Sequence, residues 1–207
     1  MVKVKVCGLT NFADYRIACE LGAYWAGFIF YQKSPRFIAP ERARRVIKRG
    51  RFSVVKVGVF VNEAIARIRE VFNQVGLDIV QLHGDEDPAY CQALGLPYWK
   101  VIRVKGLSSL EEMENYSCET FLLDACAGIS YGGTGKAIDF SVLQKALGRQ
   151  RKIIVAGGVS VETVEQVISL RPFGVDVCSS LEEYPGEKSE QKMREFFQAI
   201  NKWRETK

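Results

Sequence analysis

Short runs of apolar, often β-branched residues alternate with amphipathic stretches along the whole chain. The runs are typical of buried strands, and the stretches between them carry apolar residues at helical spacing. The predicted strands cover Val2–Cys7, Trp25–Phe30, Val54–Val61, Asp78–Leu82, Tyr98–Val104, Thr120–Asp124, Lys152–Ala156 and Gly174–Val177. The predicted helices cover Phe12–Leu21, Pro40–Lys48, Glu63–Val75, Pro88–Leu94, Phe140–Leu147, Val161–Leu170 and Glu190–Trp203. After the fifth strand, SSLEEMENY predicts a single turn or an abbreviated helix.

This order of elements predicts a closed barrel of parallel strands. Four segments pass from a helix end through Gly or Pro into a strand: ELGAYWAGFIF, QVGLDIVQLHG, ALGLPYWKVIR and SLRPFGVDVCS. Units of about 25 residues, repeated eight times with right-handed crossovers, close into a (β/α)₈ or TIM barrel. The alternative is a doubly wound open sheet, which normally has a Gly-rich fingerprint after its first strand, where this chain reads CGLTN. We therefore expect a single-domain α/β barrel over residues 1–207.

Residues that could take part in catalysis or ligand binding follow these strands. They are Cys7, Arg36, His83, Asp124, the pair Gly157-Gly158, and Ser179. A (β/α)₈ barrel collects its active site from the carboxyl ends of several strands, all at one face. The sequence therefore predicts one site assembled from the whole chain.

Cys7 and Asp124 are the candidate base and acid. Cys7 precedes a predicted helix capped at Thr10 or Asn11, and the helix dipole lowers a nearby thiol's pKa toward neutrality, which suits a base or nucleophile. A buried strand cysteine is the alternative. Asp124 closes TFLLD, where partial desolvation favours the protonated form that a general acid needs; a helix cap is its alternative. The first and sixth strands are not neighbours, so the two residues would face each other across the barrel mouth.

The remaining strand-end residues suit binding. The loops AGGVS, with Gly157 and Gly158, and CSSLE, with Ser179, follow strands seven and eight, where barrels often bind phosphate. The alternative is a tight strand–helix turn. Arg36 in KSPRFI could hold a carboxylate in bidentate fashion or be exposed to solvent. No G-x-S-x-G elbow is present, so a catalytic triad with His83 is not expected. His83 is predicted either to contact the substrate or to be a polar residue whose hydrogen bonds are made within the protein.

The GGTGK segment after Asp124 resembles a nucleotide-binding loop only superficially. Ser130 stands where the first glycine of that motif should be, and Ala137 replaces the Ser or Thr that would hold magnesium. We therefore exclude a nucleoside triphosphatase. The Gly-rich loop, with Gly132 and Gly133, is instead predicted to cover a bound substrate.

The charge distribution indicates which classes of binding partner to expect. The 29 basic and 24 acidic residues are interspersed except in RARRVIKRGR, which fits the solvated face of a helix. This predicts no nucleic-acid partner, and an anionic small molecule suits the net charge of +5.

Six cysteines without a C-x-x-C pair indicate a reducing compartment, and a single histidine makes a zinc site unexpected. Without a signal peptide or a membrane-length apolar run, we expect a cytoplasmic protein with no membrane partner. The oligomeric state, monomer or homodimer, stays open.

In combination, several motifs resemble the phosphoribosylanthranilate isomerase family of tryptophan biosynthesis, from Val4 to about Lys188. They are VKVCGLTN, GFIFYQKSPRFIAPERA, KVGVFVN, VQLHGDE, LLDA followed by GGTGKAIDF, VAGGV, and RPFGVDVCSS. The resemblance implies a TIM barrel that needs no cofactor or metal. It implies Cys7 as general base, Asp124 as general acid, Arg36 on the anthranilate carboxylate and His83 lining the pocket. It also implies backbone phosphate contacts at Gly157, Gly158 and Ser179, with the Gly132–Gly135 loop over the site.

The implied reaction is an Amadori rearrangement. Asp124 would protonate the ribose ring oxygen of N-(5-phosphoribosyl)anthranilate and open the ring to a Schiff base. Cys7 would then take the proton from C2, and the resulting enolamine would tautomerise to 1-(2-carboxyphenylamino)-1-deoxyribulose 5-phosphate. One departure concerns the loop after strand eight, usually Ser-Ser-Gly-Val-Glu in the family. Here it reads Cys178-Ser179-Ser180-Leu181-Glu182, so Ser180 could crowd the phosphate or add a donor.

Two other functions are consistent with a phosphate-binding barrel. A ribulose-phosphate epimerase would need a metal site, which one histidine makes difficult, and a dual-substrate sugar isomerase would be expected to have Asp where Cys7 stands. A catalytically silent barrel that serves as a binding subunit is the non-enzymatic alternative. The altered CSSLE loop favours it, and the intact Cys7 and Asp124 pair argues against it.

Overall fold

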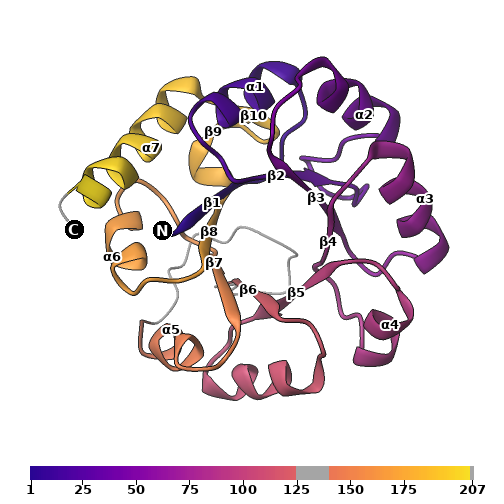
Figure 1. Cartoon of the computed structure of the whole chain (residues 1–207), viewed down its shortest axis with the longest axis vertical. Coiled ribbons are helices and arrows are strands. Elements are labelled where there is room, and N and C mark those ends of the chain that lie inside the picture. The colour runs from indigo at the N-terminus through magenta and orange to yellow at the C-terminus, as the bar shows by residue number, and fades with distance from the viewer. Residues whose placement is uncertain (125–139, 206–207) are drawn as a thin grey trace.

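Eight parallel strands close into a barrel in chain order, with the last strand pairing with the first (Figure 1). The computed structural model describes residues 1–124 and 140–205. Its barrel strands are β1 (Lys3–Val6), β2 (Trp25–Ile29), β3 (Val55–Phe60), β4 (Ile79–Leu82), β5 (Tyr98–Arg103), β6 (Thr120–Asp124), β7 (Lys152–Ala156) and β8 (Gly174–Val177). The (β/α)₈ prediction is confirmed, and the β1–β8 pairing rules out the open sheet.

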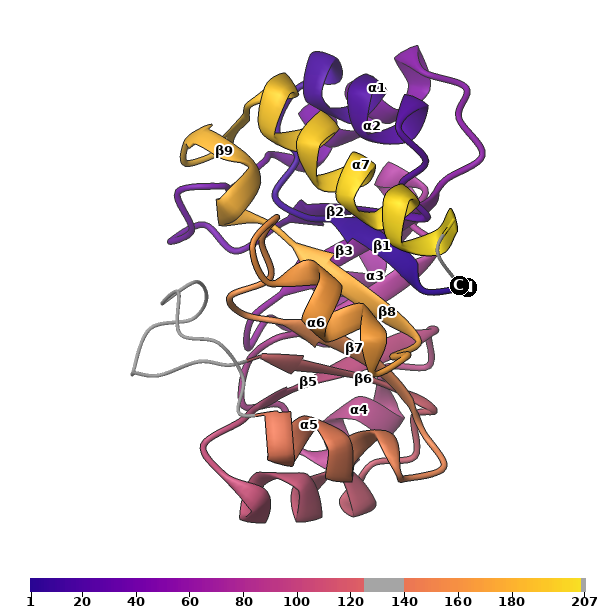
Figure 2. The same cartoon turned by 90° about the vertical axis from the view of Figure 1, so that its left-hand side faces the viewer.

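Helices surround this barrel (Figures 1 and 2). They are α1 (Phe12–Glu20), α2 (Pro40–Arg49), α3 (Ile65–Val75), α4 (Pro88–Ala93), α5 (Phe140–Leu147), α6 (Val164–Ser169) and α7 (Glu190–Glu205). After β5 the chain forms a 3₁₀ helix, η1 (Leu107–Asn115), which confirms the abbreviated connection predicted there. Among the described residues, no helix is long and apolar enough to cross a membrane.

Most predicted boundaries lie within two residues of the observed ones, but α6 begins later than predicted. Its start was predicted at Val161 and is observed at Val164. The amide of Ser160 donates to the Thr163 hydroxyl, and the Thr163 amide donates to the Ser160 carbonyl. These local bonds form a turn in place of the first helical turn, since Ser and Thr side chains compete with helical hydrogen bonds.

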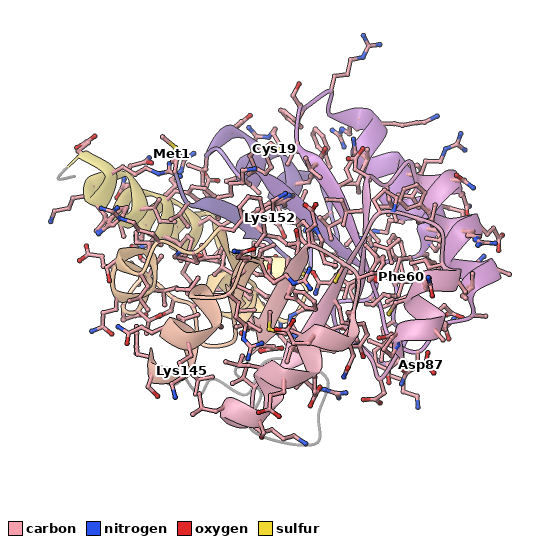
Figure 3. All side chains as sticks on the ribbon, turned by 60° about the horizontal axis from the view of Figure 1, so that its bottom comes forward. Met1, Cys19, Phe60, Asp87, Lys145 and Lys152 are labelled. Atoms are coloured by element: carbon pink, nitrogen blue, oxygen red, sulfur yellow. The ribbon has the colours of Figure 1, made fainter. Side chains whose placement is uncertain are left out.

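Alternate strand residues face the barrel interior. Leu122 and Ile154 belong to an inner apolar cluster with Trp25 and Trp99, whereas the residues next to them in sequence pack in the outer cluster with the helices. The two tryptophan rings meet edge to face, with centroids 5.2 Å apart. Side chains therefore fill the interior of the barrel as well as the layer between the barrel and the helices. Asp87 and Lys145 lie at the periphery of the molecule (Figure 3).

A short antiparallel hairpin follows β8 and was not predicted. It consists of η2 (Ser179–Leu181), β9 (Glu182–Tyr184) and β10 (Glu187–Lys188), with a turn at Pro185-Gly186. Gly186 has φ 87°, a left-handed conformation that favours glycine. The hairpin lies beside the start of α1 (Figure 1), where Thr10 donates to the Gly186 carbonyl and the Lys188 amide donates to Asp14. This placement brings two charged residues of the hairpin to the barrel mouth.

Candidate active site

A cavity of about 420 Å³ opens at the carboxyl ends of the strands. It is lined by every described residue predicted for the site: Cys7, Arg36, His83, Asp124, Gly157, Gly158 and Ser179. Gly132 and Gly133, predicted to cover the substrate, lie outside the described residues. The cavity is also lined by Gln81, Asp176 and Cys178, which were not predicted. The structure thus gathers the strand-end residues into one place.

Cys7 is buried immediately after β1 and contacts a second thiol, that of Cys178. The hydrogen bond with Cys178 and burial raise the pKa of Cys7 well above its usual value, although Lys5 acts in the opposite direction. The prediction that a helix dipole lowers this pKa is therefore wrong. Helix α1 begins only at Phe12, with Asn11 as its cap, so Cys7 does not lie at the helix terminus.

The pKa of Cys178 shifts the other way, to about 7. The hydrogen bond with Cys7 is the largest cause, and the charges of Lys188 and Arg36 add to it, while burial opposes them. Because the two sulfurs are coupled, they titrate as a pair. Cys178 is therefore the thiol of the two that ionises more readily.

A buried ion pair lies next to Cys7 inside the barrel. The Lys5 Nζ is 3.0 and 3.1 Å from the two carboxylate oxygens of Asp176 on the neighbouring strand β8. Burial is the largest single effect and lowers the pKa of Lys5, but Asp176 and Cys7 together outweigh it and raise that pKa. Burial raises the pKa of Asp176 to about 7 against the pull of Lys5. Of this pair, the Lys5 ammonium acts on Cys7 and lowers the pKa of its thiol.

Lys5→Met is expected to lower the free energy of unfolding by about 3 kcal/mol, because it leaves the Asp176 carboxyl buried without its partner. The double variant Lys5→Met/Asp176→Leu is expected to recover most of this loss, since no buried charge remains. Urea unfolding of the two variants and the wild type measures both effects. A single variant as stable as the wild type would contradict the expectation.

His83 and Asp124 meet across the cavity wall, from the ends of β4 and β6. The His83 Nε2 lies 3.3 Å from Asp124 Oδ2, and the Asp124 side chain is buried. On the other side of the ring, Gln81 Nε2 is 3.1 Å from His83 Nδ1. When the Gln81 amide donates to Nδ1, the ring proton stands on Nε2 and faces the carboxylate. The two side chains are therefore in contact, but the His83 Nε2 makes no hydrogen bond with the described residues.

The loop after His83 is held by a second buried ion pair. Lys100 on β5 donates to Glu86 and to the Gly84 carbonyl, both at 2.8 Å. Glu86 also accepts the amide hydrogens of Gly84 and Asn62. The Lys100–Glu86 pair is buried and hydrogen-bonded to the loop backbone, which rigidifies the backbone on which the histidine stands.

Arg36 already holds a carboxylate, which belongs to the chain itself. Its Nε and Nη2 make bidentate contacts with Glu182 at 2.7 to 3.0 Å. Lys188 also bonds Glu182, at 2.9 Å, so the hairpin fixes the guanidinium at the mouth. The predicted contact of Arg36 with a substrate carboxylate stays a prediction, and of the guanidinium nitrogens Nη1 makes no contact with Glu182.

The two loops predicted to bind phosphate line the same cavity. Gly157 and Gly158 have φ of 74° and 75°, a left-handed backbone in which no side chain stands between the chain and the cavity. Ser180 donates its hydroxyl to the Val159 carbonyl at 2.7 Å, which joins the two loops. Because its hydroxyl is occupied there, Ser180 holds the loops together in this structure and does not offer a spare donor.

Several residues of this site escaped sequence reasoning, although a common signal marks most of them. Lys5, Gln81 and Asp176 are polar residues that alternate with apolar residues in their strands, and such residues need partners inside the barrel. For Glu182 and Lys188 the signal was the Pro-Gly turn between them. Among the described residues, no group of three or more His, Cys, Asp or Glu side chains is arranged to hold a metal.

Comparison with known proteins finds similarity over almost the whole chain. The family model of N-(5′-phosphoribosyl)anthranilate isomerase matches residues 4–199. An N-(5′-phosphoribosyl)anthranilate isomerase of Rubrobacter xylanophilus is 44% identical over 204 residues, which cover 96% of this chain and 98% of the relative. The family match contains every residue that lines the cavity.

Solved structures agree with the sequences. The crystal structure of phosphoribosyl anthranilate isomerase from Thermotoga maritima matches with a TM-score of 0.90 and 38% identity, covering 98% of this chain and 100% of that one. A structure of such an isomerase in complex with reduced 1-(o-carboxyphenylamino)-1-deoxyribulose 5-phosphate matches with a TM-score of 0.87 and 36% identity, at the same coverage.

Proposed function

This chain belongs to the N-(5′-phosphoribosyl)anthranilate isomerase family, and from this premise we propose how its residues perform the isomerisation. The enzyme converts N-(5′-phosphoribosyl)anthranilate to 1-(2-carboxyphenylamino)-1-deoxyribulose 5-phosphate in tryptophan biosynthesis. The assignment of an acid and a base is supported by the arrangement of side chains around the cavity. It has a carboxyl–imidazole pair on one wall and two sulfurs at the end of β1 and β8.

Ring opening is the acid's step. Asp124 gives a proton to the ribose ring oxygen, the C1–O bond breaks, and the nitrogen lone pair forms the Schiff base. The proton stays on the new hydroxyl group of the substrate, and Asp124 is left as a carboxylate that faces the His83 Nε2 at 3.3 Å. Burial of Asp124 keeps water away from the transferred proton.

Proton abstraction is the base's step. The Cys7 thiolate takes the proton from C2 of the sugar, and the C2–H electron pair moves toward the Schiff-base nitrogen to give an enolamine. Lys5 and Arg36 lie near the sulfur and stabilise its negative charge. The enolamine then tautomerises to the ketone product.

The ends of the substrate are held by the groups around the cavity. We assign the phosphate to the backbone of Gly157, Gly158 and Ser179, where a left-handed turn and a 3₁₀ helix begin. The carboxylate falls to the Nη1 of Arg36, whose other nitrogens are fixed by Glu182. Two fixed ends would place the reacting carbons between acid and base.

The direct test is a fluorescence assay of the purified protein with freshly generated phosphoribosylanthranilate. The expected result is consumption of the substrate well above the spontaneous rate, without added metal or cofactor. A rate equal to the spontaneous one would overturn the proposal and favour the silent barrel.

The proposal also covers the partners, location and assembly of the protein. We propose a phosphorylated small molecule as the sole substrate class, with neither nucleic acid nor membrane as partner. A cytoplasmic location and a monomer or homodimer belong to this proposal as well. Light scattering on the eluting protein measures the mass that distinguishes the two assemblies.

A further inference from the structure

Glu182 holds Arg36 from outside the cavity. Arg36 lines the cavity, whereas Glu182 is not among the lining residues. The Glu182 side chain is buried, and its two oxygens accept hydrogen bonds from the Nε and Nη2 of Arg36. Glu182 therefore contacts the arginine without lining the space in which a substrate would lie.

Glu182 is itself fixed by the hairpin that carries it. The Lys188 Nζ and the Gly186 amide donate to its Oε1 at 2.9 and 3.2 Å. The buried Lys188 side chain also donates to the Cys178 carbonyl at 2.9 Å, which ties the hairpin to the end of β8. A substrate carboxylate is not expected to displace Glu182, because displacement would leave the buried Lys188 ammonium without its partner.

The backbone and the stem of Arg36 are held as well. Gly8 has φ 74°, and a β-carbon there would lie 2.9 Å from Arg36 Cδ, so the stem of the side chain passes over bare backbone. A β-carbon at Gly186 would lie 3.3 Å from the Pro35 carbonyl oxygen and 3.8 Å from Arg36 Cα. The hairpin turn thus packs against the backbone that carries the arginine.

The contact with Glu182 leaves one edge of the guanidinium free. A guanidinium has five N–H donors in a rigid plane, and Glu182 accepts from Nε and Nη2. The remaining hydrogens of Nη1 and Nη2 form a second fork, whose spacing matches the two oxygens of a carboxylate. Because Glu182 fixes the plane of the guanidinium, this second fork has a single direction.

We propose that Glu182 is a positioning residue that determines substrate specificity. By holding one edge of Arg36, it aims the free edge at the carboxylate on the aromatic ring of the substrate. The site then selects an arylamine that carries a carboxylate, since a fixed fork loses little conformational entropy when it binds. This inference rests on the proposed function for the identity of the carboxylate.

The test compares two ligands by isothermal titration calorimetry. The first is the reaction product after reduction of its ketone, and the second is the same compound with a phenyl ring in place of the carboxyphenyl ring. The wild type is expected to bind the first at least about tenfold more tightly, as the loss of a charged hydrogen bond predicts. Neither measurement requires turnover.

Two variants of Glu182 separate positioning from charge. Glu182→Gln removes a negative charge beside the site, which by itself would tighten the binding of any anion. Loss of positioning acts in the opposite direction, and we expect it to weaken binding of the carboxylated ligand about tenfold. Glu182→Asp keeps the charge but withdraws the carboxylate by one methylene, so it is expected to weaken the same ligand.

The matched control is Glu183→Gln, the same change at the next position of β9. Glu183 is exposed and contacts Lys192 at 3.6 Å, so both affinities are expected to stay at the wild-type level. The phenyl ligand shows that each Glu182 variant is folded, because its affinity is expected to be unchanged. In the isomerase assay, the Glu182 variants are expected to raise KM about tenfold with a much smaller change in kcat.

The outcomes distinguish this inference from the proposed function. An active isomerase whose preference for the carboxylated ligand is unchanged or increased in Glu182→Gln and Glu182→Asp would overturn it. Equal weakening of both ligands would also overturn it, since that result indicates a purely structural role. A protein without isomerase activity that loses the preference in both variants would support the role of Glu182 and overturn the proposed function.

Discussion

Asp124→Asn is expected to lower kcat at least about a hundredfold, the usual size of a general acid's contribution. The amide has nearly the shape of the carboxyl group but cannot give up a proton to the ribose oxygen. It can still contact His83 Nε2, which lies 3.3 Å from the carboxylate oxygen, so the fold and substrate binding are expected to be retained. Steady-state kinetics at saturating substrate measures the loss, which should appear in kcat and leave KM little changed.

The matched control changes a carboxylate far from the cavity in the same way. Asp78 precedes β4 at the opposite end of the barrel, where it is half-exposed and paired with Lys56. Asp78→Asn is expected to keep nearly wild-type turnover, because it touches no residue of the cavity. If Asp124→Asn were as active as Asp78→Asn, Asp124 would not be the acid.

Cys7→Ala is the second change with a large expected effect, again a loss of kcat of at least about a hundredfold. It removes the sulfur that takes the C2 proton and leaves Cys178 as the nearest base. Cys178 follows the neighbouring strand β8, displaced sideways from the position that Cys7 holds, so it cannot occupy the same place relative to C2. Single-turnover measurements show whether the loss lies in the proton-transfer step.

Two further variants sharpen this result. Cys7→Ser keeps the size of the side chain, but a hydroxyl is a far weaker acid than a thiol, so it is expected to be nearly as inactive as Cys7→Ala. Cys19→Ser, which removes a thiol outside the cavity, is expected to be fully active. Near-normal turnover in Cys7→Ala would show that another group abstracts the proton.

Most residues of this site could be located from the rule that a barrel collects its active site at the carboxyl ends of its strands. This rule depends on local sequence pattern alone. Cys7, His83 and Asp124 could each be placed at a strand's carboxyl end from the apolar run before them, and the barrel brings all such ends to one face. The resemblance to a known family then supplied the reaction. Neither source indicated what each side chain touches.

The polar residues within the strands show where local pattern fails. In VKVKVC the valines point outward to the helices and the lysines inward, so that Lys5 is fully buried. Alternation of apolar and charged residues ordinarily indicates a strand with one face in water. Here the polar face is the barrel interior, and Asp176 makes this possible.

The sequence by itself determined the alternation of strands and helices, the (β/α)₈ class and the edge at which the reacting groups gather. Those properties follow from side-chain periodicity and chain connectivity, which act over a few residues or follow from order alone. Only the tertiary structure decided the partners. Lys5 and Asp176 are 171 residues apart in the chain, and Arg36 and Glu182 are 146 apart. Closure of β8 onto β1 brings them into contact, and the charge at Cys7 depends on that contact.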